Sequence, residues 1–186
     1  MSDLLLGALV GGALLVGGAL SKNKIQDEMT AASDSFRKWD DLFRKHGEMN
    51  GVDPWMLKAI AMNESSLGDA TSVRRGIASP KDIEASKSSD GKSWGLMQMT
   101  LPTARDFDRM ATAEKLNDPE YSVKLAAKFV RSLMSQFRET EFIVKAYNQG
   151  AGNTRKEMSG QIDGYAEEYW ARYQRNRDLI RRKQGV

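Results

Sequence analysis

The chain has 186 residues, of which 28% are charged, and its formal net charge is +3. This length suits one domain with a buried core and short appendages. The sequence has no cysteine and one histidine, His46, which excludes disulfides, thiolate zinc sites and any Ser-His-Asp triad that does not use His46. We therefore expect no metal and no cofactor, and chemistry carried by carboxyl, amide, hydroxyl and aromatic groups.

An uncharged run of Leu, Ala, Val and Gly occupies residues 4–20. Its 17 residues reach the lower limit of about 17–25 for a membrane-spanning helix. A signal peptide fits poorly, because no Lys or Arg precedes the run and no Ala-x-Ala site closes it. Gly7 and Gly11 form a small-xxx-small pair that favours helix association. The sequence predicts a hydrophobic membrane anchor over residues 1–24, whose Gly-rich face would contact a second copy or other proteins.

The next segment, residues 25–47, carries four apolar or aromatic residues at helical spacing, namely Phe36, Trp39, Leu42 and Phe43. It is predicted to be an amphipathic connecting helix that packs on the domain and ends at Gly47. His46 is then interpreted as a cation at a helix end, and we discount it as a catalyst.

The main domain is predicted to occupy residues 48–186. Its first helix begins at Asp53-Pro54, an N-cap followed by a proline at the first helical position. Residues 55–62 are largely apolar, and the helix ends at Glu64. A carboxyl group at the end of a buried helix is partly desolvated, which favours the protonated form that a general acid requires.

The remainder of the domain has a mainly helical pattern. Residues 68–93 are polar and rich in Gly, Ser and Asp, which predicts a long loop or a small β-hairpin lobe. Helices are expected over four ranges, 100–110, 118–137, 141–149 and 162–183, of which the second has a strong start signal in Asn117-Asp118-Pro119. The expected fold class is mainly α, with at most a small β-hairpin lobe.

Three short motifs occur in order along the domain: Asn63-Glu64-Ser65-Ser66, Trp94-Gly95-Leu96-Met97-Gln98-Met99 and Ala146-Tyr147-Asn148-Gln149-Gly150. Each motif is weak alone, but their order and spacing are specific. Over roughly residues 48–175 the sequence resembles the SLT-type lytic transglycosylases of the lysozyme-like superfamily, which cut the MurNAc-GlcNAc backbone of bacterial peptidoglycan. The resemblance implies a lysozyme-like α+β domain whose substrate is the peptidoglycan glycan strand.

In that family a single glutamate protonates the scissile glycosidic oxygen and then, as a carboxylate, deprotonates the C6 hydroxyl of the same MurNAc. The product is 1,6-anhydro-MurNAc, so no second carboxylate is needed, whereas most glycosidases use two. The resemblance gives the catalytic role to Glu64.

The resemblance also implies substrate contacts from the second motif. Gly95 would let the backbone pass close to the sugar, Met97 would lie against a sugar ring, and Gln98 would hydrogen-bond an acetamido or hydroxyl group. Leu96 and Met99 are expected to be core residues. The alternative is that Met97 also belongs to the core.

The third motif and the C-terminal region complete the predicted site. Tyr147 and Asn148 would line the opposite wall, unless the Tyr147 hydroxyl is satisfied structurally. Tyr165 is the candidate for the family's last tyrosine, whose hydroxyl lies near the catalytic carboxyl. Tyr169 and Tyr173 compete for this role because they follow at helical spacing.

The charges beside the apolar run bear on location. Asp3 precedes the run, whereas Lys22 and Lys24 follow it, and the positive-inside tendency would keep the domain in the cytoplasm. A peptidoglycan enzyme has no substrate there. We expect a phage virion protein that reaches the host cell envelope and periplasm during infection. It would be membrane-anchored through residues 4–20, whose Gly-rich face would contact a second copy or virion proteins. A bacterial inner-membrane protein facing the periplasm is the alternative.

Three other functions stay open. A goose-type lysozyme-like hydrolase would share Glu64 and position a water with an aspartate such as Asp90, although Thr100 stands two residues after Gln98 where an acid would be expected. A structural ejection or pore protein would keep an inactive muralytic domain. A nucleic-acid adaptor would use the basic residues within 172–183, but a solvated helix end explains those cations better, and we expect no nucleic-acid binding.

Overall fold

The computed structural model describes residues 34–68, 92–162, 164 and 166–186. The predicted anchor over residues 1–24 lies outside these ranges, as does Asp90. Within the described ranges no helix is both long and apolar enough to cross a bilayer.

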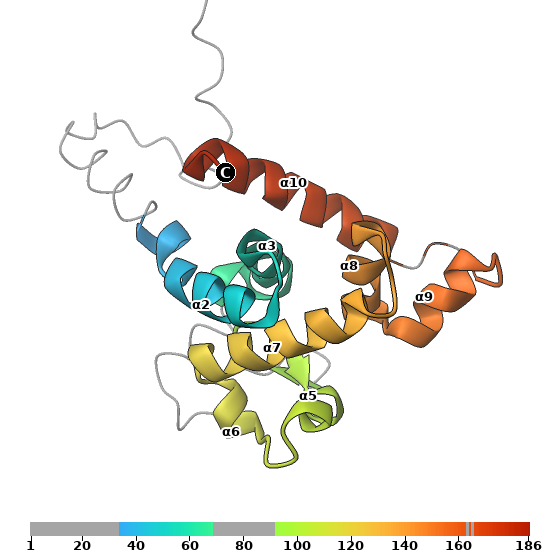
Figure 1. The fold of residues 1–186 in the computed structure, drawn as a ribbon, viewed down its shortest axis with the longest axis horizontal. Helices are drawn as coiled ribbons and strands as arrows, with labels where there is room; N and C mark the ends of the chain where they lie inside the picture. The colour runs from blue at the N-terminus through green and yellow to red at the C-terminus, as the bar shows by residue number, and fades with distance from the viewer. Residues whose placement is uncertain (1–33, 69–91, 163, 165) are drawn as a thin grey trace, which may run out of the picture. The chain divides into compact units, whose positions relative to one another are not determined.

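Helices dominate the described part of the chain (Figure 1). In chain order the elements are α2 (Asp40–Asn50), α3 (Pro54–Ser65), the 3-10 turn η1 (Ser66–Gly68), β1 (Ser93–Trp94), β2 (Met99–Thr100), α5 (Leu101–Phe107), α6 (Ala113–Leu116), α7 (Pro119–Met134), α8 (Thr140–Gln149), α9 (Ala151–Met158) and α10 (Glu167–Gln184). The mainly α fold class is confirmed.

Helix α3 runs through the centre of the domain. It starts as predicted, with Pro54 in the first turn and the Asp53 Oδ1 accepting a hydrogen bond from the Trp55 N–H at 2.8 Å. Leu57 and Ile60 are fully buried, because α2, α7 and α10 all pack against this helix (Figure 1). The apolar composition of α3 thus reflects enclosure by three neighbours, and Glu64 sits at the end of a buried helix as expected.

Helix α2 differs from the prediction at its C-terminal end. It continues through Gly47 to Asn50 and stops at Gly51, which has a left-handed φ of 63°. A Cβ at Gly47 would lie 2.7 Å from the Val52 carbonyl oxygen, so this glycine permits close packing rather than ending the helix. Phe43 is fully buried in the core, and α2 therefore belongs to the domain and crosses the boundary predicted at residue 47.

His46 also differs from its predicted surroundings. The residue lies inside α2 and is buried. Burial and, next, the charge of Lys45 lower its pKa, so the imidazole is neutral at pH 7. The interpretation of His46 as a helix-terminal cation is wrong.

The β structure in the described ranges is a two-stranded antiparallel sheet, in which Ser93 is opposite Thr100 and Trp94 is opposite Met99. It encloses the Gly95–Gln98 turn of the second motif. A small β lobe was expected within 68–93, and the observed strands lie at the end of that range and just beyond it. Helix α5 follows directly, with Thr100 as its N-cap.

The later helices match the predicted ranges closely. Asp118 is the N-cap of α7, and its Oδ1 accepts a hydrogen bond from the Tyr121 N–H at 2.7 Å. The helix therefore starts where the sequence predicted. The short helices α6 and α9 were not predicted, because stretches of four and eight residues carry too little periodic signal. Helix α10 lies along α3 and also contacts α8 (Figure 1).

Candidate active site

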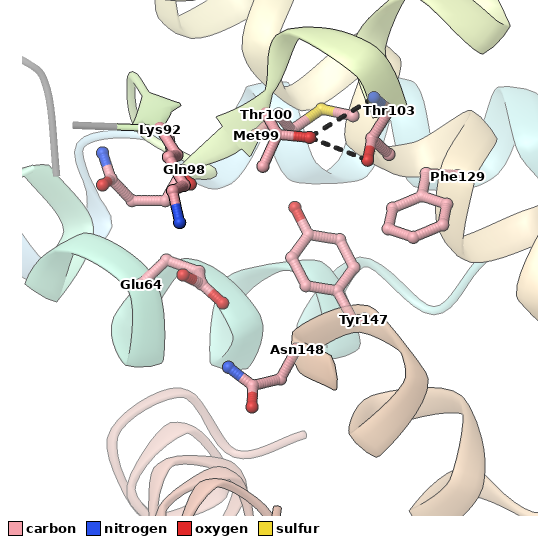
Figure 2. Close-up of a pocket in the computed structure, with 10 residues that line it drawn as sticks. Glu64, Lys92, Gln98, Met99, Thr100, Thr103, Phe129, Tyr147 and Asn148 are labelled. Carbon is pink, nitrogen blue, oxygen red and sulfur yellow. Dashed lines mark hydrogen bonds between the residues drawn. The ribbon is translucent and has the colours of Figure 1, made fainter. Parts of the chain in front are cut away.

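A pocket of about 300 Å³ brings the three motifs together. Its described lining consists of Glu64, Lys92, Ser93, Gln98, Met99, Thr100, Thr103, Phe129, Tyr147 and Asn148. Figure 2 shows the Glu64 carboxyl beside Tyr147 and Asn148, which come from a second helix, with Gln98 on the other side of the pocket. The end of α3, the sheet and the end of α8 therefore form the walls of one site.

Glu64 is the penultimate residue of α3 and is half-buried. Burial raises its pKa to about 7, although a hydrogen bond from Tyr169 and the charge of Arg172 both act to lower it. Desolvation outweighs these contributions because the carboxylate form loses hydration in the pocket wall. Near neutral pH the group is present in both protonation states, as an acid that must later act as a base requires.

The hydroxyl of Tyr169 donates a hydrogen bond to the Glu64 Oε1 at 2.6 Å. Tyr169 thus occupies the position predicted for Tyr165, which lies outside the described residues. Burial raises the pKa of Tyr169 well above its usual value, and the nearby Glu64 raises it further. The phenol therefore stays protonated and acts as a fixed donor to one carboxyl oxygen.

Two asparagines hold α10 in register with the end of α3. The Asn63 Nδ2 donates to the Tyr169 carbonyl oxygen at 3.0 Å, and the Asn176 Nδ2 donates to the Asn63 Oδ1 at 2.8 Å. Because Asn63 precedes Glu64, this chain of hydrogen bonds fixes the helix that carries the phenol relative to the carboxyl group that it contacts.

The end of α3 is also bonded to the Gly95–Gln98 turn. The Ser65 Oγ donates to the Leu96 carbonyl oxygen at 2.7 Å, and the Met97 N–H donates to the Ser122 Oγ at 3.1 Å.

Ser66 and Leu67, directly after the helix, have left-handed φ values of 52° and 59°. Such backbone conformations cost energy outside glycine and persist only where the surroundings enforce them.

Gly95 has a structural role that differs from the predicted one. Its φ is 76°, and a Cβ there would lie 1.8 Å from the Leu116 carbonyl oxygen. The close approach is therefore to the backbone of α6, and Gly95 is absent from the described pocket lining. Its carbonyl oxygen accepts a hydrogen bond from the Gln98 Nε2 at 2.8 Å.

Of the other residues in the turn, Gln98 reaches the pocket and Met97 does not. Gln98 lines the pocket with a left-handed φ of 45°. Met97 is fully buried in the core, which corrects the expectation that its side chain lies against a sugar. Leu96 and Met99 are buried in the core as expected, and Met99 also contributes to the pocket lining.

Tyr147 and Asn148 line the pocket from α8 as predicted. The Tyr147 hydroxyl donates to the Met97 carbonyl oxygen at 2.9 Å, and its ring centroid lies 5.2 Å from that of Phe129. Tyr147 therefore has a structural hydrogen bond in addition to its place in the wall. Asn148 is exposed, and its amide faces the pocket in Figure 2.

A buried cation that sequence reasoning missed supports this wall. Lys145 lies two residues before Tyr147, and its ammonium group pairs with Glu141 and Glu157 at 2.7 Å each and also with Glu167. Burial alone would lower the pKa of Lys145, but these three carboxylates raise it above its usual value. The pairs connect α8 to α9 and to the start of α10, so they fix the two helices that carry Tyr147 and Tyr169.

The described residues contain no group of three or more His, Asp or Glu side chains placed to hold a metal ion.

Comparisons with known proteins agree with this geometry. The family model described as the Transglycosylase SLT domain matches residues 41–169. Peptidoglycan transglycosylase gp16 of Escherichia phage T7 is 29% identical over 134 residues, which cover 69% of this chain and 9% of gp16. The fold is similar to that of the lytic transglycosylase Slt from Pseudomonas aeruginosa, solved as an inactive mutant, with a TM-score of 0.52 and 20% identity over 77% of this chain and 22% of that chain. The family match covers more than half of the sequence and confirms the resemblance found there: this chain belongs to the Transglycosylase SLT domain family.

Proposed function

We propose that this chain is a peptidoglycan lytic transglycosylase that cleaves the MurNAc-GlcNAc β-1,4 bond with Glu64 as both acid and base. One observation carries the proposal. Glu64 is the sole carboxyl group in the described pocket lining, and its pKa is raised to about 7. A single carboxyl group with this pKa suits a reaction in which it first gives and then takes a proton.

The proton balance follows from the contacts of Glu64. Tyr169 donates to Oε1, which leaves Oε2 as the oxygen that carries the proton to the glycosidic oxygen. The bond between C1 of MurNAc and the GlcNAc oxygen breaks, and the C6 hydroxyl then bonds to C1 while its proton passes to the Glu64 carboxylate. Glu64 ends the cycle protonated, and the product is 1,6-anhydro-MurNAc.

The environment of Glu64 supports both halves of this cycle. Once the proton has left, the carboxylate faces the oxocarbenium-like sugar and stabilises its positive charge. The hydrogen bond from Tyr169 and the charge of Arg172 both favour that carboxylate. Burial favours the acid form that begins the next cycle.

The substrate contacts proposed here come from the pocket walls. The amides of Gln98 and Asn148 line the pocket from opposite sides and suit the acetamido and hydroxyl groups of a glycan strand. Tyr147 supplies an aromatic surface between them, backed by Phe129. Gly95 and Met97 contribute by shaping the turn that presents Gln98.

The biological setting is also part of the proposal. Similarity to a phage peptidoglycan transglycosylase supports a virion protein that opens the host cell wall locally during infection. Anchoring through residues 4–20 and association through their Gly-rich face stay predictions from the sequence. A bacterial inner-membrane enzyme facing the periplasm is the alternative location.

Replacing Glu64 by Gln tests the proposed role. The substitution keeps the shape and removes the proton donor, so turnover of purified peptidoglycan should fall by at least about a hundredfold. Glu48→Gln, at an exposed position in α2, removes the same charge far from the pocket and should leave turnover near that of the parent. Equal turnover in the parent and Glu64→Gln would contradict the proposal, and no turnover in either would indicate an inactive muralytic domain.

A further inference from the structure

A second cavity, of about 340 Å³, lies at the other end of the central helix. Its described lining consists of Asp53, Met56, Thr140, Trp170, Tyr173, Gln174, Arg177, Asp178 and Arg181. These residues come from the N-cap and first turn of α3, the start of α8 and the part of α10 between Trp170 and Arg181. Glu64 lies eleven positions after Asp53, which is about 16 Å along a helix. The second cavity is therefore distinct from the catalytic pocket.

One wall of this cavity is an aromatic pair. The rings of Trp170 and Tyr173 are stacked, with centroids 5.4 Å apart and planes inclined by 15°. Tyr173 is buried, whereas Trp170 is half-buried. The buried ring holds the indole in place, and a rigid aromatic face of this kind provides apolar contact for the C–H groups of a sugar ring.

The rest of the lining is polar and balanced in charge. The Arg177 Nη1 lies 2.8 Å from the Asp53 Oδ2. This nitrogen is buried, and the ion pair holds the guanidinium group in the cavity wall. Arg181 pairs with Asp178 at 3.2 Å, and two arginines therefore face two aspartates.

This charge balance decides the class of ligand. A phosphate or a polyanion would meet two carboxylates, whereas a neutral ligand with many hydroxyl groups would find donors and acceptors around it. The cavity volume lies at the lower end of about 300–1,000 Å³ for small-molecule pockets, which is room for a single sugar unit with its acetamido group.

We propose that this cavity binds a neutral N-acetylated sugar of peptidoglycan, in addition to the sugars held in the catalytic pocket. The inference rests on the proposed function, because it takes peptidoglycan as the substrate. A second attachment raises the effective concentration of the enzyme at an insoluble wall without any change in the catalytic pocket. The cavity would therefore retain the enzyme on the wall between cuts.

Binding of the full chain to purified cell-wall sacculi in detergent buffer tests the proposal, with Glu64→Gln as the background so that nothing is cleaved. Trp170→Ala should weaken binding by on the order of tenfold. Because this change removes a core-facing ring, a second variant, Gln174→Ala with Arg181→Ala, alters two exposed side chains and should weaken binding severalfold. The matched control is Gln161→Ala with Arg182→Ala, two exposed positions outside the cavity lining.

Turnover measurements with Glu64 intact separate this proposal from the catalytic one. The Gln174 and Arg181 double variant should raise the KM for sacculi severalfold while leaving kcat/KM for short soluble glycan fragments unchanged. If the parent cleaves sacculi and both cavity variants bind like the control, the second site is refuted and the proposed catalytic activity stands. If the parent does not cleave but the cavity variants lose binding, the second site stands and the proposed activity fails.

Discussion

Glu64→Gln should make the folded protein more stable at alkaline pH, in addition to removing activity. The reason is that the folded chain holds the Glu64 proton more tightly than the unfolded chain does. Burial raises the folded pKa from the ordinary 4.5 to about 7, so the parent loses stability as the pH rises between these two values. A glutamine has no proton to lose and escapes this penalty.

The size of the effect follows from the pKa values. One pKa unit corresponds to about 1.4 kcal/mol, so the rise of the Glu64 pKa from 4.5 to about 7 corresponds to about 3 kcal/mol. Because Glu64 is half-buried and faces the solvent in the pocket, water screens part of this penalty, and about 1–3 kcal/mol is expected. The difference between parent and variant should be small at pH 4 and complete at pH 8.

Urea unfolding of the parent, Glu64→Gln and Glu48→Gln at pH 4, 6 and 8 measures this difference. Glu48→Gln removes the same charge from an exposed position in α2, so subtracting its effect isolates the contribution of the pocket. The midpoint for Glu64→Gln should move above that of the parent between pH 4 and pH 8. If the two variants change in parallel with pH, the Glu64 carboxyl group is not held protonated, and the assignment of an acid with a pKa near 7 is refuted.

Three further predictions follow from the described contacts. Tyr169→Phe removes a hydrogen bond that lowers the pKa of Glu64, so the alkaline limb of the pH–rate profile should move up by about one pH unit. Tyr165→Phe should leave that limb in place. The reverse result would show that Tyr165, and not Tyr169, is the hydrogen-bond donor to Glu64. Gly95→Ala forces a Cβ into the backbone of α6 and should cost about 1–3 kcal/mol of folding stability. Gly152→Ala lies within α9 with open space around it and should stabilise the fold by about 0.5–1 kcal/mol. Similar melting temperatures for the two variants would contradict this prediction. EDTA should not change turnover, because the proposed mechanism uses protein groups alone, and an inhibition that added metal reverses would overturn it.

Sequence reasoning succeeded where the signal is local. Asp53-Pro54 determines the start of α3, and the apolar run that follows determines its burial, so the position of Glu64 at the end of a buried helix was predictable. The order of the motifs was enough to predict that Gln98, Tyr147 and Asn148 lie at one pocket.

Sequence reasoning was less successful where an outcome depends on packing between distant segments. The contact of Tyr169 with Glu64 depends on the rotation of α10 about its axis, which Asn176 helps to fix through a contact across 113 positions. Met97 and Gln98 are neighbours in one turn, yet one is in the core and the other in the pocket. The turn geometry that separates them depends on hydrogen bonds to α3 and α7 rather than on local composition.

Buried charge was the least predictable feature. Lys145 sits in a helix with an ordinary polar pattern, and Glu141 is a partner that helical spacing would suggest. Glu157 and Glu167 approach it from 12 and 22 residues away, and no periodicity in the sequence indicates that these three helices converge.

Mass spectrometry of the muropeptides released from purified sacculi is the most direct measurement of the proposed reaction. A transglycosylase with Glu64 as acid and base should give 1,6-anhydro-MurNAc ends, which borohydride does not reduce, and Glu64→Gln should release almost none. Reducing MurNAc ends as the main product would show that water attacks the sugar. That result would contradict the single-glutamate mechanism and assign the chain to the goose-type lysozyme-like hydrolases.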